Sequence, residues 1–281
     1  MEKAREVTLV SGLVSAARRE DKLVGFVPTM GALHEGHLSL VRQAREACDF
    51  VVVSIFVNSL QFGPGEDFQR YPRRPEKDAA LCEQAGVDLV YIPDPREFYE
   101  KDFATSVEVE GLSEGGEGAM RPGHFRGVAT VLTKLFLQIG PDMVFLGRKD
   151  LQQAAIVRRL IRDLDFPIQL VVGETVRDAD GLALSSRNAY LSPEDRKRAA
   201  AFPRALLATR ARAVRGERDP GAIERDARST LEAAGFDVDY VEVVDAMTMR
   251  RPPRVEPGTA LAAAIRLGKK RLIDNVYLLE P

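Results

Sequence analysis

Short apolar runs alternate with amphipathic segments of helical length along the first 175 residues, and this alternation limits the possible folds more than any other feature. The expected strands are residues 23–27, 50–57, 89–92, 143–146 and 168–172. Helical patterns separate them at residues 37–47, 75–85, 128–139 and 151–164, and residues 8–17 predict a first amphipathic helix. Strands separated by helices of this length indicate right-handed βαβ units and a parallel sheet.

The pattern changes after about residue 192. Residues 193–218 are rich in Ala and Arg and predict one or two exposed helices, whose interleaved acidic residues favour a solvated face over a phosphate or RNA patch. Short strands are expected at residues 240–244, 260–267 and 272–278, with a basic turn at 268–271. The predicted fold class is therefore α/β, with a Rossmann-like parallel sheet and helices on both faces at residues 1–175, and a smaller C-terminal α+β cap domain at 176–281.

Composition excludes several classes of protein. The chain has 40 Lys and Arg against 42 Asp and Glu, a net charge of −2, which argues against a general nucleic-acid binder. Its two cysteines, Cys48 and Cys82, cannot build a disulfide framework or a four-thiolate zinc site. The early apolar stretch lacks the basic segment of a signal peptide, and the longest apolar run, residues 50–57, is too short to span a bilayer. We therefore expect a cytoplasmic protein without a membrane partner.

Two of the three histidines lie in one turn, PTMGALHEGH at residues 28–37, after the first expected strand. A turn between a strand and a helix N-terminus is the usual place in a parallel sheet to hold phosphate, although neither GxGxxG nor GxxxxGK[ST] occurs there. His34 and His37 are three residues apart, so both rings can face one ligand, and Gly31 and Gly36 allow close backbone approach. A metalloprotease site needs histidines four apart, and a structural helix cap is the remaining alternative.

Two amides follow the strand expected at residues 50–57. Parallel sheets bind ligands at the carboxyl ends of their strands, so Asn58 and Gln61 are well placed to hydrogen-bond a polar substrate. A loop that these amides merely cap is an equally good interpretation.

Two further segments carry groups that suit a nucleotide. Residues 147–150, GRKD, follow a strand and open a helix, where Lys149 suits phosphate and Asp150 suits ribose hydroxyls. Residues 184–188, LSSRN, offer hydroxyls and a guanidinium that can cradle polyphosphate without base-specific contacts. Taken singly, each segment also fits a polar surface turn, so the joint pattern is what indicates function.

The five segments PTMGALHEGH, FVNSLQFGPGEDF, RPGHFRGV, GRKDLQQ and GLALSSRNAYL occur in an order and spacing that closely resemble the pantothenate synthetases, or pantoate–β-alanine ligases. The resemblance covers the whole first domain and continues into the second. HEGH resembles the HxGH signature of the wider nucleotidyltransferase superfamily, which includes the class I aminoacyl-tRNA synthetases.

The resemblance implies an ATP-dependent condensation of pantoate with β-alanine to pantothenate. In this family the pantoate carboxylate attacks the α-phosphorus of ATP, and β-alanine then releases AMP from the pantoyl adenylate. The chemistry needs positioning and charge stabilisation but no enzyme nucleophile. The resemblance also implies a homodimer with small-molecule substrates. Mg²⁺ is expected to accompany ATP and, because no dedicated carboxylate cage is evident in the sequence, to be bound mainly through the ATP phosphates, with no metal held by the chain itself. The charge balance leads us to expect no nucleic-acid partner.

Site residues follow from the same resemblance. His37 is expected to stabilise charge at the α-phosphate as an imidazole donor, since attack by a carboxylate requires no proton removal, and Val176 is expected to meet adenine through its backbone. The expected catalytic residues are His34, His37, Lys149, Ser185 and Arg187. Those expected to bind ATP are Met30, Gly31, Ala32, Leu33, His34, Glu35, Gly36, His37, Gly147, Arg148, Lys149, Asp150, Val176, Leu184, Ser185, Ser186 and Arg187. Pantoate or β-alanine is expected to contact Asn58, Gln61 and Gln153.

Three positions depart from the family pattern: Ser59 replaces a common Pro, Arg148 a common Glu, and Leu184 a frequent Met. None removes a group that the chemistry needs. In RPGHFRGV, Arg121 and His124 suit secondary polar contacts, with loop packing as the alternative. Two other functions remain open: a nucleotidyltransferase that acts on a phosphorylated acceptor, and a non-enzymatic nucleotide-sensing or nucleic-acid-binding module.

Overall fold

The computed structural model describes residues 1–268 and 270–281, so the predicted basic turn at 268–271 includes one residue, Lys269, that lies outside the described part. The chain forms two compact units. The first unit contains Met1–Val109, Arg121–Arg148 and Ile156–Glu174, and the second contains Glu110–Met120, Lys149–Ala155 and Thr175–Pro281. The prediction of domains at 1–175 and 176–281 does not include the two earlier segments of the second unit.

The first unit is built on a six-stranded sheet in the order β1-β4-β3-β2-β5-β6, and every neighbouring pair is parallel. The strands are β1 (Glu2–Ala4), β2 (Val24–Thr29), β3 (Phe50–Ile55), β4 (Leu89–Tyr91), β5 (Met143–Gly147) and β6 (Gln169–Gly173). The order runs outward in opposite directions from β2 and β5, so the segments that follow these two strands diverge. In open parallel sheets this divergence marks the place where ligands bind.

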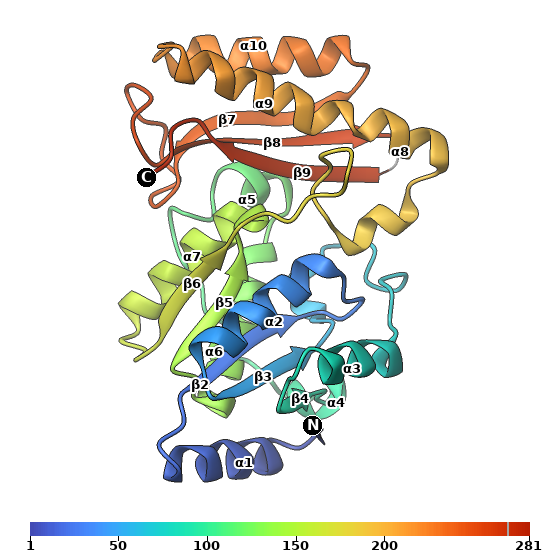
Figure 1. The fold of residues 1–281 in the computed structure, drawn as a ribbon, viewed down its shortest axis with the longest axis vertical. Helices are drawn as coiled ribbons and strands as arrows, with labels where there is room; N and C mark the ends of the chain where they lie inside the picture. The colour runs from blue at the N-terminus through green and yellow to red at the C-terminus, as the bar shows by residue number, and fades with distance from the viewer. Residues whose placement is uncertain (269) are drawn as a thin grey trace. The chain divides into compact units, whose positions relative to one another are not determined.

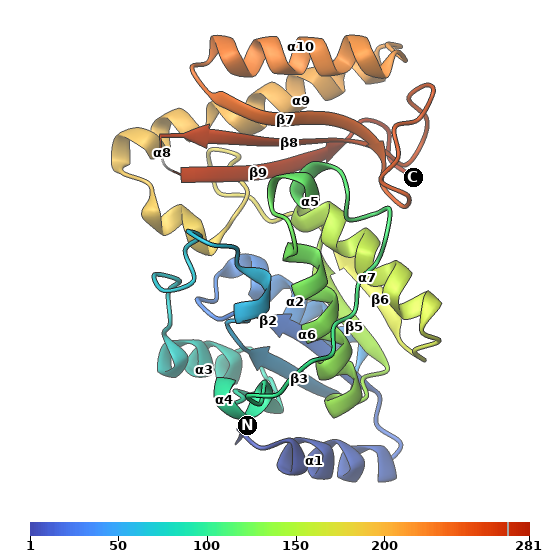
Figure 2. The ribbon, with the colours of Figure 1, turned by 180° about the vertical axis from the view of Figure 1, so that it is seen from behind.

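Helices cover both faces of this sheet, as predicted. Figures 1 and 2 view the unit from opposite sides: α2 (Glu35–Ala47) lies in front of the sheet in one, and α6 (His124–Ile139) in the other. Val51, Val53 and Phe145 of the sheet pack with Leu40 and Val41 of α2. The remaining helices of the unit are α1 (Val7–Arg19), α3 (Pro75–Gln84) and α4 (Pro95–Phe98). The helix α7 (Leu151–Asp163) belongs to the second unit up to Ala155 and to the first from Ile156.

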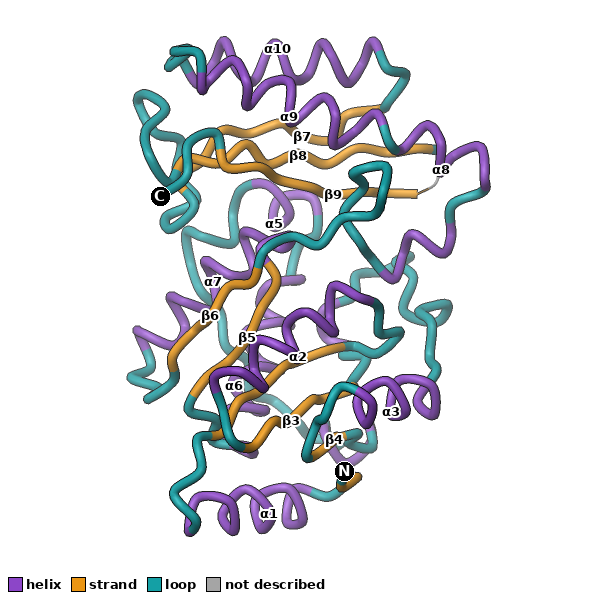
Figure 3. Tube along the Cα trace, in the orientation of Figure 1, coloured by secondary structure: helices purple, strands orange, loops and turns teal. Residues whose placement is uncertain are grey.

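The second unit contains a three-stranded antiparallel sheet, β7-β8-β9, formed by β7 (Asp237–Asp245), β8 (Thr259–Leu267) and β9 (Lys270–Tyr277). Figure 3 shows its strands in orange beneath the purple helices α9 (Ala201–Val214) and α10 (Pro220–Ala233), with α8 (Pro193–Ala199) at their right-hand end. The strand β8 alternates Leu261, Ala263 and Ile265 with Ala260 and Ala262 in two separate clusters, so both faces of this sheet are buried. The predicted α+β fold of this unit is confirmed.

Several local expectations were incomplete. The segment 193–218 was expected to be exposed, but Phe202 and Leu206 of α9 are fully buried against the second sheet. They lie four residues apart, and Thr209 and Ala213 continue the same buried stripe, which the neighbouring arginines mask in the sequence. No helix was expected before residue 128 in this part of the chain, but residues 111–127 contain a short helix, α5 (Gly116–Met120), and the first turn of α6. No helix in residues 1–268 or 270–281 combines the length and apolar character needed to cross a membrane.

Candidate active site

The turn between β2 and α2 has an unusual backbone. Gly31 has a φ of 81° and Ala32 a φ of 51°, so two consecutive residues are left-handed. A Cβ on Gly31 would lie 3.0 Å from both Ile55 Cγ2 and Asp78 Oδ2, so this position needs glycine for its conformation and for the space. The helix then begins with His34 as its N-cap.

His34 and His37 are joined to each other through the backbone. The Nδ1 atom of His34 accepts a hydrogen bond from Gly36 N at 3.1 Å, and Nδ1 of His37 accepts one from His34 N at 3.3 Å. The two ring centroids are 4.1 Å apart. Because Nδ1 acts as an acceptor in both rings, a neutral imidazole at either position carries its proton on Nε2. His34 is thus a helix cap, as the alternative interpretation held, and its phosphate contact remains a prediction.

The backbone N–H groups of this turn are engaged within the protein. Gly31 N donates to Thr29 Oγ1 at 3.1 Å, while Ala32 N and Leu33 N donate to the Asp78 carboxylate at 2.8 and 2.9 Å. Phosphate-binding loops of the glycine-rich type instead direct such N–H groups at the ligand. The donors that suit an anion here are therefore the imidazole Nε2–H groups.

The two amides after β3 are oriented by their own hydrogen bonds, in the 3₁₀ helix η1 (Ser59–Gln61). Asn58 Oδ1 accepts from Leu60 N at 3.2 Å and from the Tyr99 hydroxyl at 2.9 Å, so Asn58 Nδ2 must be the end that donates to Gln61 Oε1 at 3.1 Å. Gln61 Nε2 consequently points the other way and lies 3.0 Å from Met30 Sδ. Asn58 caps the loop, as one interpretation held, and also sets the orientation of Gln61.

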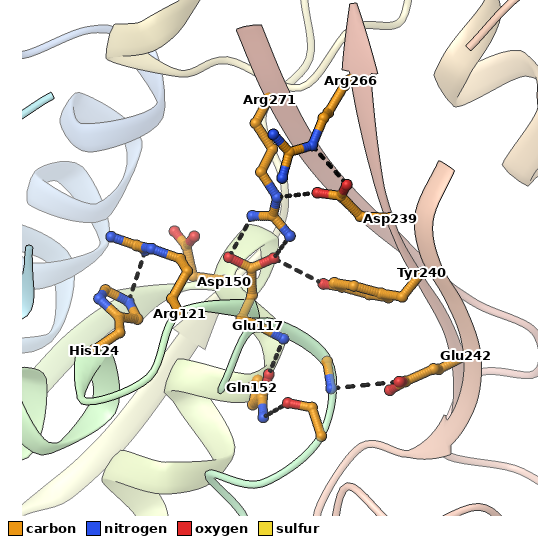
Figure 4. A network of polar contacts seen from close by, with 12 residues as sticks. Glu117, Arg121, His124, Asp150, Gln152, Asp239, Tyr240, Glu242, Arg266 and Arg271 are labelled. Carbon is orange, nitrogen blue, oxygen red and sulfur yellow. Dashed lines mark hydrogen bonds and ion pairs between the residues drawn. The ribbon is translucent and has the colours of Figure 1, made fainter. Parts of the chain in front are cut away.

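The segment RPGHFRGV, residues 121–128, packs against η1. A Cβ on Gly127 would lie 2.3 Å from Leu60 O, so any side chain there would displace η1. His124 Nδ1 donates to Gln61 O at 2.9 Å, and its Nε2, 3.0 Å from Arg121 Nη1, then acts as the acceptor, a contact drawn in Figure 4. His124 is buried, in accord with the loop-packing interpretation.

Arg121 forms a two-point ion pair with Glu66, at 2.8 Å from Nε and 2.7 Å from Nη2. Burial alone would raise the pKa of Glu66, but the hydrogen bonds and positive charge of Arg121 outweigh burial and lower it. This pair ties the loop after η1 to the segment that carries His124.

Gln61 and the β2–α2 turn belong to the first unit, and Gln153 and Lys149 to the second. Lys149 and Asp150 lie in the 3₁₀ helix η2 (Arg148–Asp150), 3.5 Å apart between Nζ and Oδ1, just before α7. Arg148, one of the three departures, is paired with Glu174 of the first unit at 2.5 Å.

Gln152 and Gln153 have different environments. Gln152 is buried and clamps the chain that precedes α5: its Nε2 donates to Leu112 O and Gly115 O at 2.8 Å, and its Oε1 accepts from Glu117 N at 2.9 Å. Gln153 is only half-buried. Gln152 thus has a structural role, and the substrate contact of Gln153 stays a prediction.

A buried charge network surrounds Glu117, which sequence reasoning missed (Figure 4). Arg271 donates to both Glu117 oxygens, at 2.8 and 2.6 Å, and to Asp239 at 2.5 Å, while Tyr240 OH donates to Glu117 at 3.1 Å. Burial, followed by the Glu117 charge, raises the pKa of Tyr240 well above its usual value. Through Glu117 N and Gln152, this network connects β7 and β9 to the first turn of α7.

The segment that contains Ser185 and Arg187 folds as the 3₁₀ helix η3 (Ser186–Tyr190). Ser185 Oγ caps it by accepting from Arg187 N at 3.3 Å, as the polar-turn interpretation predicted. Val176 O accepts from Leu184 N at 3.0 Å, which closes the chain between them into a narrow loop. Arg177 holds this loop to Asp274, and Asn275 Nδ2 donates to Lys149 O at 2.9 Å. The strand β9 therefore supports both this loop and η2.

Within residues 1–268 and 270–281 there is no group of three or more His, Cys, Asp or Glu side chains arranged to hold a metal ion.

Each of the two units contains part of the set of site residues predicted from the sequence. The first unit gathers His34, His37, Asn58 and Gln61, and the second holds Lys149, Asp150, Gln153, Val176 and the segment 184–187.

Comparison with known proteins gives one family across the whole chain. The family model described as Pantoate-beta-alanine ligase matches residues 2–277. A pantothenate synthetase of Heliobacterium modesticaldum is 50% identical over 279 residues, which cover 99% of this chain and 98% of that protein. One of Moorella thermoacetica is 48% identical over 279 residues, with 99% of each chain covered.

Solved structures agree. The crystal structure of pantothenate synthetase from Thermus thermophilus has a TM-score of 0.94 at 48% identity, covering 99% of this chain and 100% of that one. Pantoate-beta-alanine ligase from Francisella tularensis, complexed with beta-gamma ATP and beta-alanine, has a TM-score of 0.81 at 30% identity, covering 99% and 98%. With this fold, these motifs and these relatives, the chain belongs to the pantoate–β-alanine ligase family of enzymes.

Proposed function

We propose that the chain joins pantoate to β-alanine in two steps through a pantoyl adenylate, and that only the first step consumes ATP. The observation that carries the proposal is the pair of imidazoles after β2, whose Nδ1 atoms both accept backbone hydrogen bonds. This arrangement supplies two Nε2–H donors at the point where β2 and β5 diverge in the sheet, which suits a phosphate group.

In the first step a carboxylate oxygen of pantoate attacks the α-phosphorus of ATP. A new P–O bond forms, the bond from the α-phosphorus to the bridging oxygen breaks, and pyrophosphate leaves. Negative charge on the phosphoryl oxygens must be stabilised, and no proton has to be removed from the nucleophile. His37 donates from Nε2 to the α-phosphate, and His34 donates to the adjacent phosphate group. Lys149, Ser185 and Arg187 hold the departing pyrophosphate.

ATP binds as its Mg²⁺ complex, because Mg²⁺ prefers phosphate oxygens and water to a dedicated protein cage. The nucleotide is held by Met30 to His37, by Gly147 to Asp150, and by Leu184 to Arg187. Asp150 suits the ribose hydroxyls, and Val176 meets adenine through its backbone. The Francisella tularensis ligase, which is complexed with beta-gamma ATP and beta-alanine, supports the assignment of these two substrates.

In the second step the amine of β-alanine attacks the adenylate carbonyl, and AMP leaves with one oxygen that came from the pantoate carboxylate. Gln61 and Gln153 hold pantoate. Because Asn58 occupies Gln61 Oε1, the end of Gln61 available to substrate is the Nε2 donor, which suits the oxygen acceptors of pantoate. Asn58 acts on pantoate through this orientation.

The family resemblance supports three further proposals: that the chain is a homodimer, that it works in the cytoplasm, and that it binds no nucleic acid. The net charge of −2 agrees with the last of these. Sedimentation equilibrium of the purified chain tests the first, with a mass twice that of the 31.0 kDa monomer as the expected result.

Exchange of labelled pyrophosphate into ATP tests the mechanism. We expect exchange that requires pantoate but not β-alanine, and accumulation of AMP once β-alanine is added. Exchange that proceeds without pantoate would contradict the proposal. A nucleotidyltransferase acting on a phosphorylated acceptor would instead leave a dinucleotide product and no AMP.

A further inference from the structure

Asp78 is a buried carboxylate that none of the recognised motifs contains. It lies in the first turn of α3 and is 1% exposed. Its two oxygens accept from Ala32 N at 2.8 Å and from Leu33 N at 2.9 Å, although these residues are 46 and 45 positions away in the sequence. Asp78 therefore binds the backbone of the turn that leads to His34.

The conformation of this turn creates the need for such an acceptor. Gly31 and Ala32 are both left-handed, and Ala32 adopts this conformation without the freedom of glycine. The turn directs two successive N–H groups, those of Ala32 and Leu33, to the Asp78 carboxylate on α3. A buried N–H group without an acceptor is strongly unfavourable, so the carboxylate both satisfies the pair and fixes the turn.

The first of the two histidines, His34, directly follows Leu33 in the sequence. Leu33 N is held by Asp78, and the next backbone donor, His34 N, is bonded to Nδ1 of His37. His34 in turn caps α2 through Gly36 N. A shift of the peptides at Ala32 and Leu33 would therefore change the direction of both rings together.

We propose that Asp78 is a positioning residue for the reaction: it holds the turn 31–33 so that the His34 and His37 Nε2 donors meet the phosphate. This inference rests on the proposed function, because it assigns those donors to ATP. Asp78 itself does not contact the nucleotide, since both its oxygens face backbone N–H groups and a carboxylate would repel phosphate.

The test compares Asp78→Asn with a matched control, Glu76→Gln. Both residues lie in the first turn of α3 and both changes remove one negative charge there, but Glu76 is exposed on that turn. In Asp78→Asn the amide nitrogen faces one of the two N–H donors and can no longer accept. Pantoate-dependent ATP–pyrophosphate exchange at saturating substrates measures the result.

We expect Asp78→Asn to lower kcat for exchange on the order of 10- to 100-fold, the scale for a small misplacement of catalytic groups. The KM for pantoate should change by less than about twofold, because Gln61 is positioned by Asn58 and not by Asp78. Glu76→Gln should retain wild-type kcat. An Asp78→Asn enzyme with wild-type kcat overturns the inference.

A double-mutant cycle with His37→Ala separates positioning from a general loss of folding. If Asp78 acts through the imidazoles, the combined loss of kcat should be at least about fivefold smaller than the product of the two single losses. Simple multiplication of the losses overturns the proposal, as does a loss that the fraction of unfolded protein accounts for. Should Asp78→Asn not fold, Asp78→Glu retains the charge with displaced oxygens, and its kcat must fall while KM for pantoate holds.

The outcomes distinguish this inference from the function on which it rests. A wild-type enzyme without pantoate-dependent exchange contradicts the proposed function, whatever Asp78 does. A fully active wild type together with an equally active Asp78→Asn contradicts only the role of Asp78.

Discussion

The Nδ1 atom of His37 accepts a hydrogen bond from the backbone N–H of His34, and the two imidazole rings lie with their centroids 4.1 Å apart. One hydrogen bond thus sets the tautomer of His37 and ties its ring to the N-cap of α2. In the neutral form each ring therefore carries its proton on Nε2. The two histidines are thus coupled through the backbone, and the proposed phosphate contact depends on this coupling.

Replacing His37 with alanine removes one of these donors and also frees the N–H of His34. We expect turnover to fall by at least ~10²-fold, the usual scale for loss of a preorganised transition-state donor. Steady-state pantothenate formation measures it. Glu46→Ala, an exposed change on the same helix, is the control and should remain active. Near-normal turnover in His37→Ala would remove this residue from its role.

Tyr99→Phe should weaken the binding of pantoate but not that of ATP. The hydroxyl of Tyr99 donates to Asn58 Oδ1, and Asn58 orients Gln61. Loss of one neutral hydrogen bond, about 0.5–1.5 kcal/mol, predicts a KM for pantoate raised about 2- to 10-fold and an unchanged KM for ATP. Tyr91→Phe is the matched control, because the Tyr91 hydroxyl bonds Gln138 and not the amide pair. Equal effects of both variants on KM would contradict this relay.

Local sequence signals predicted the parallel sheet well, because β3 is a run of β-branched residues buried on both faces and α2 follows a turn with a clear cap. The helix α10 was missed although Asp219, Pro220 and the spacing of Ile223, Ala227 and Leu231 all indicate it. Its arginines and glutamates obscured a narrow apolar stripe. The three-residue strand β1 is too short to show any periodicity.

The supporting residues of the site could not be predicted, for a physical reason. Glu117 and Arg271 are 154 positions apart, and Asp78 is 45 from Leu33, so neither pair leaves a local pattern. Motifs identify residues that suit a ligand, such as His34 and Gln61. The residues that orient them depend on which chain segments the fold brings together.

Arg271→Gln should destabilise the second unit, because it leaves Glu117 and Asp239 buried without this cation. Removing one partner of a buried ion pair costs about 3–5 kcal/mol. Denaturant unfolding should show a loss of that order. Asp163→Asn, which breaks an exposed pair with Arg162, should change stability by less than about 1 kcal/mol. A similarly small effect of Arg271→Gln would mean that the network contributes little.

The Glu66–Arg121 pair predicts a pH dependence of stability. The folded-state pKa of Glu66 is lowered, so the pair stabilises the fold above the unfolded-state pKa of about 4.3, and this stabilisation is lost as the pH falls through the lower folded-state pKa. Wild type should therefore exceed Glu66→Gln in unfolding free energy at pH 7, and the difference should shrink in acid. A difference that stays constant down to pH values about two units below 4.3 would contradict this assignment.

The proposed reaction begins with attack of the pantoate carboxylate on the α-phosphorus of ATP. Pantoate labelled with ¹⁸O in its carboxylate tests it most directly, with mass spectrometry of the nucleotide product after a complete reaction with β-alanine. Attack at the α-phosphorus yields AMP that carries one ¹⁸O atom and unlabelled pyrophosphate. Unlabelled AMP, or ADP formed together with ¹⁸O-labelled inorganic phosphate, would show attack elsewhere and contradict the account.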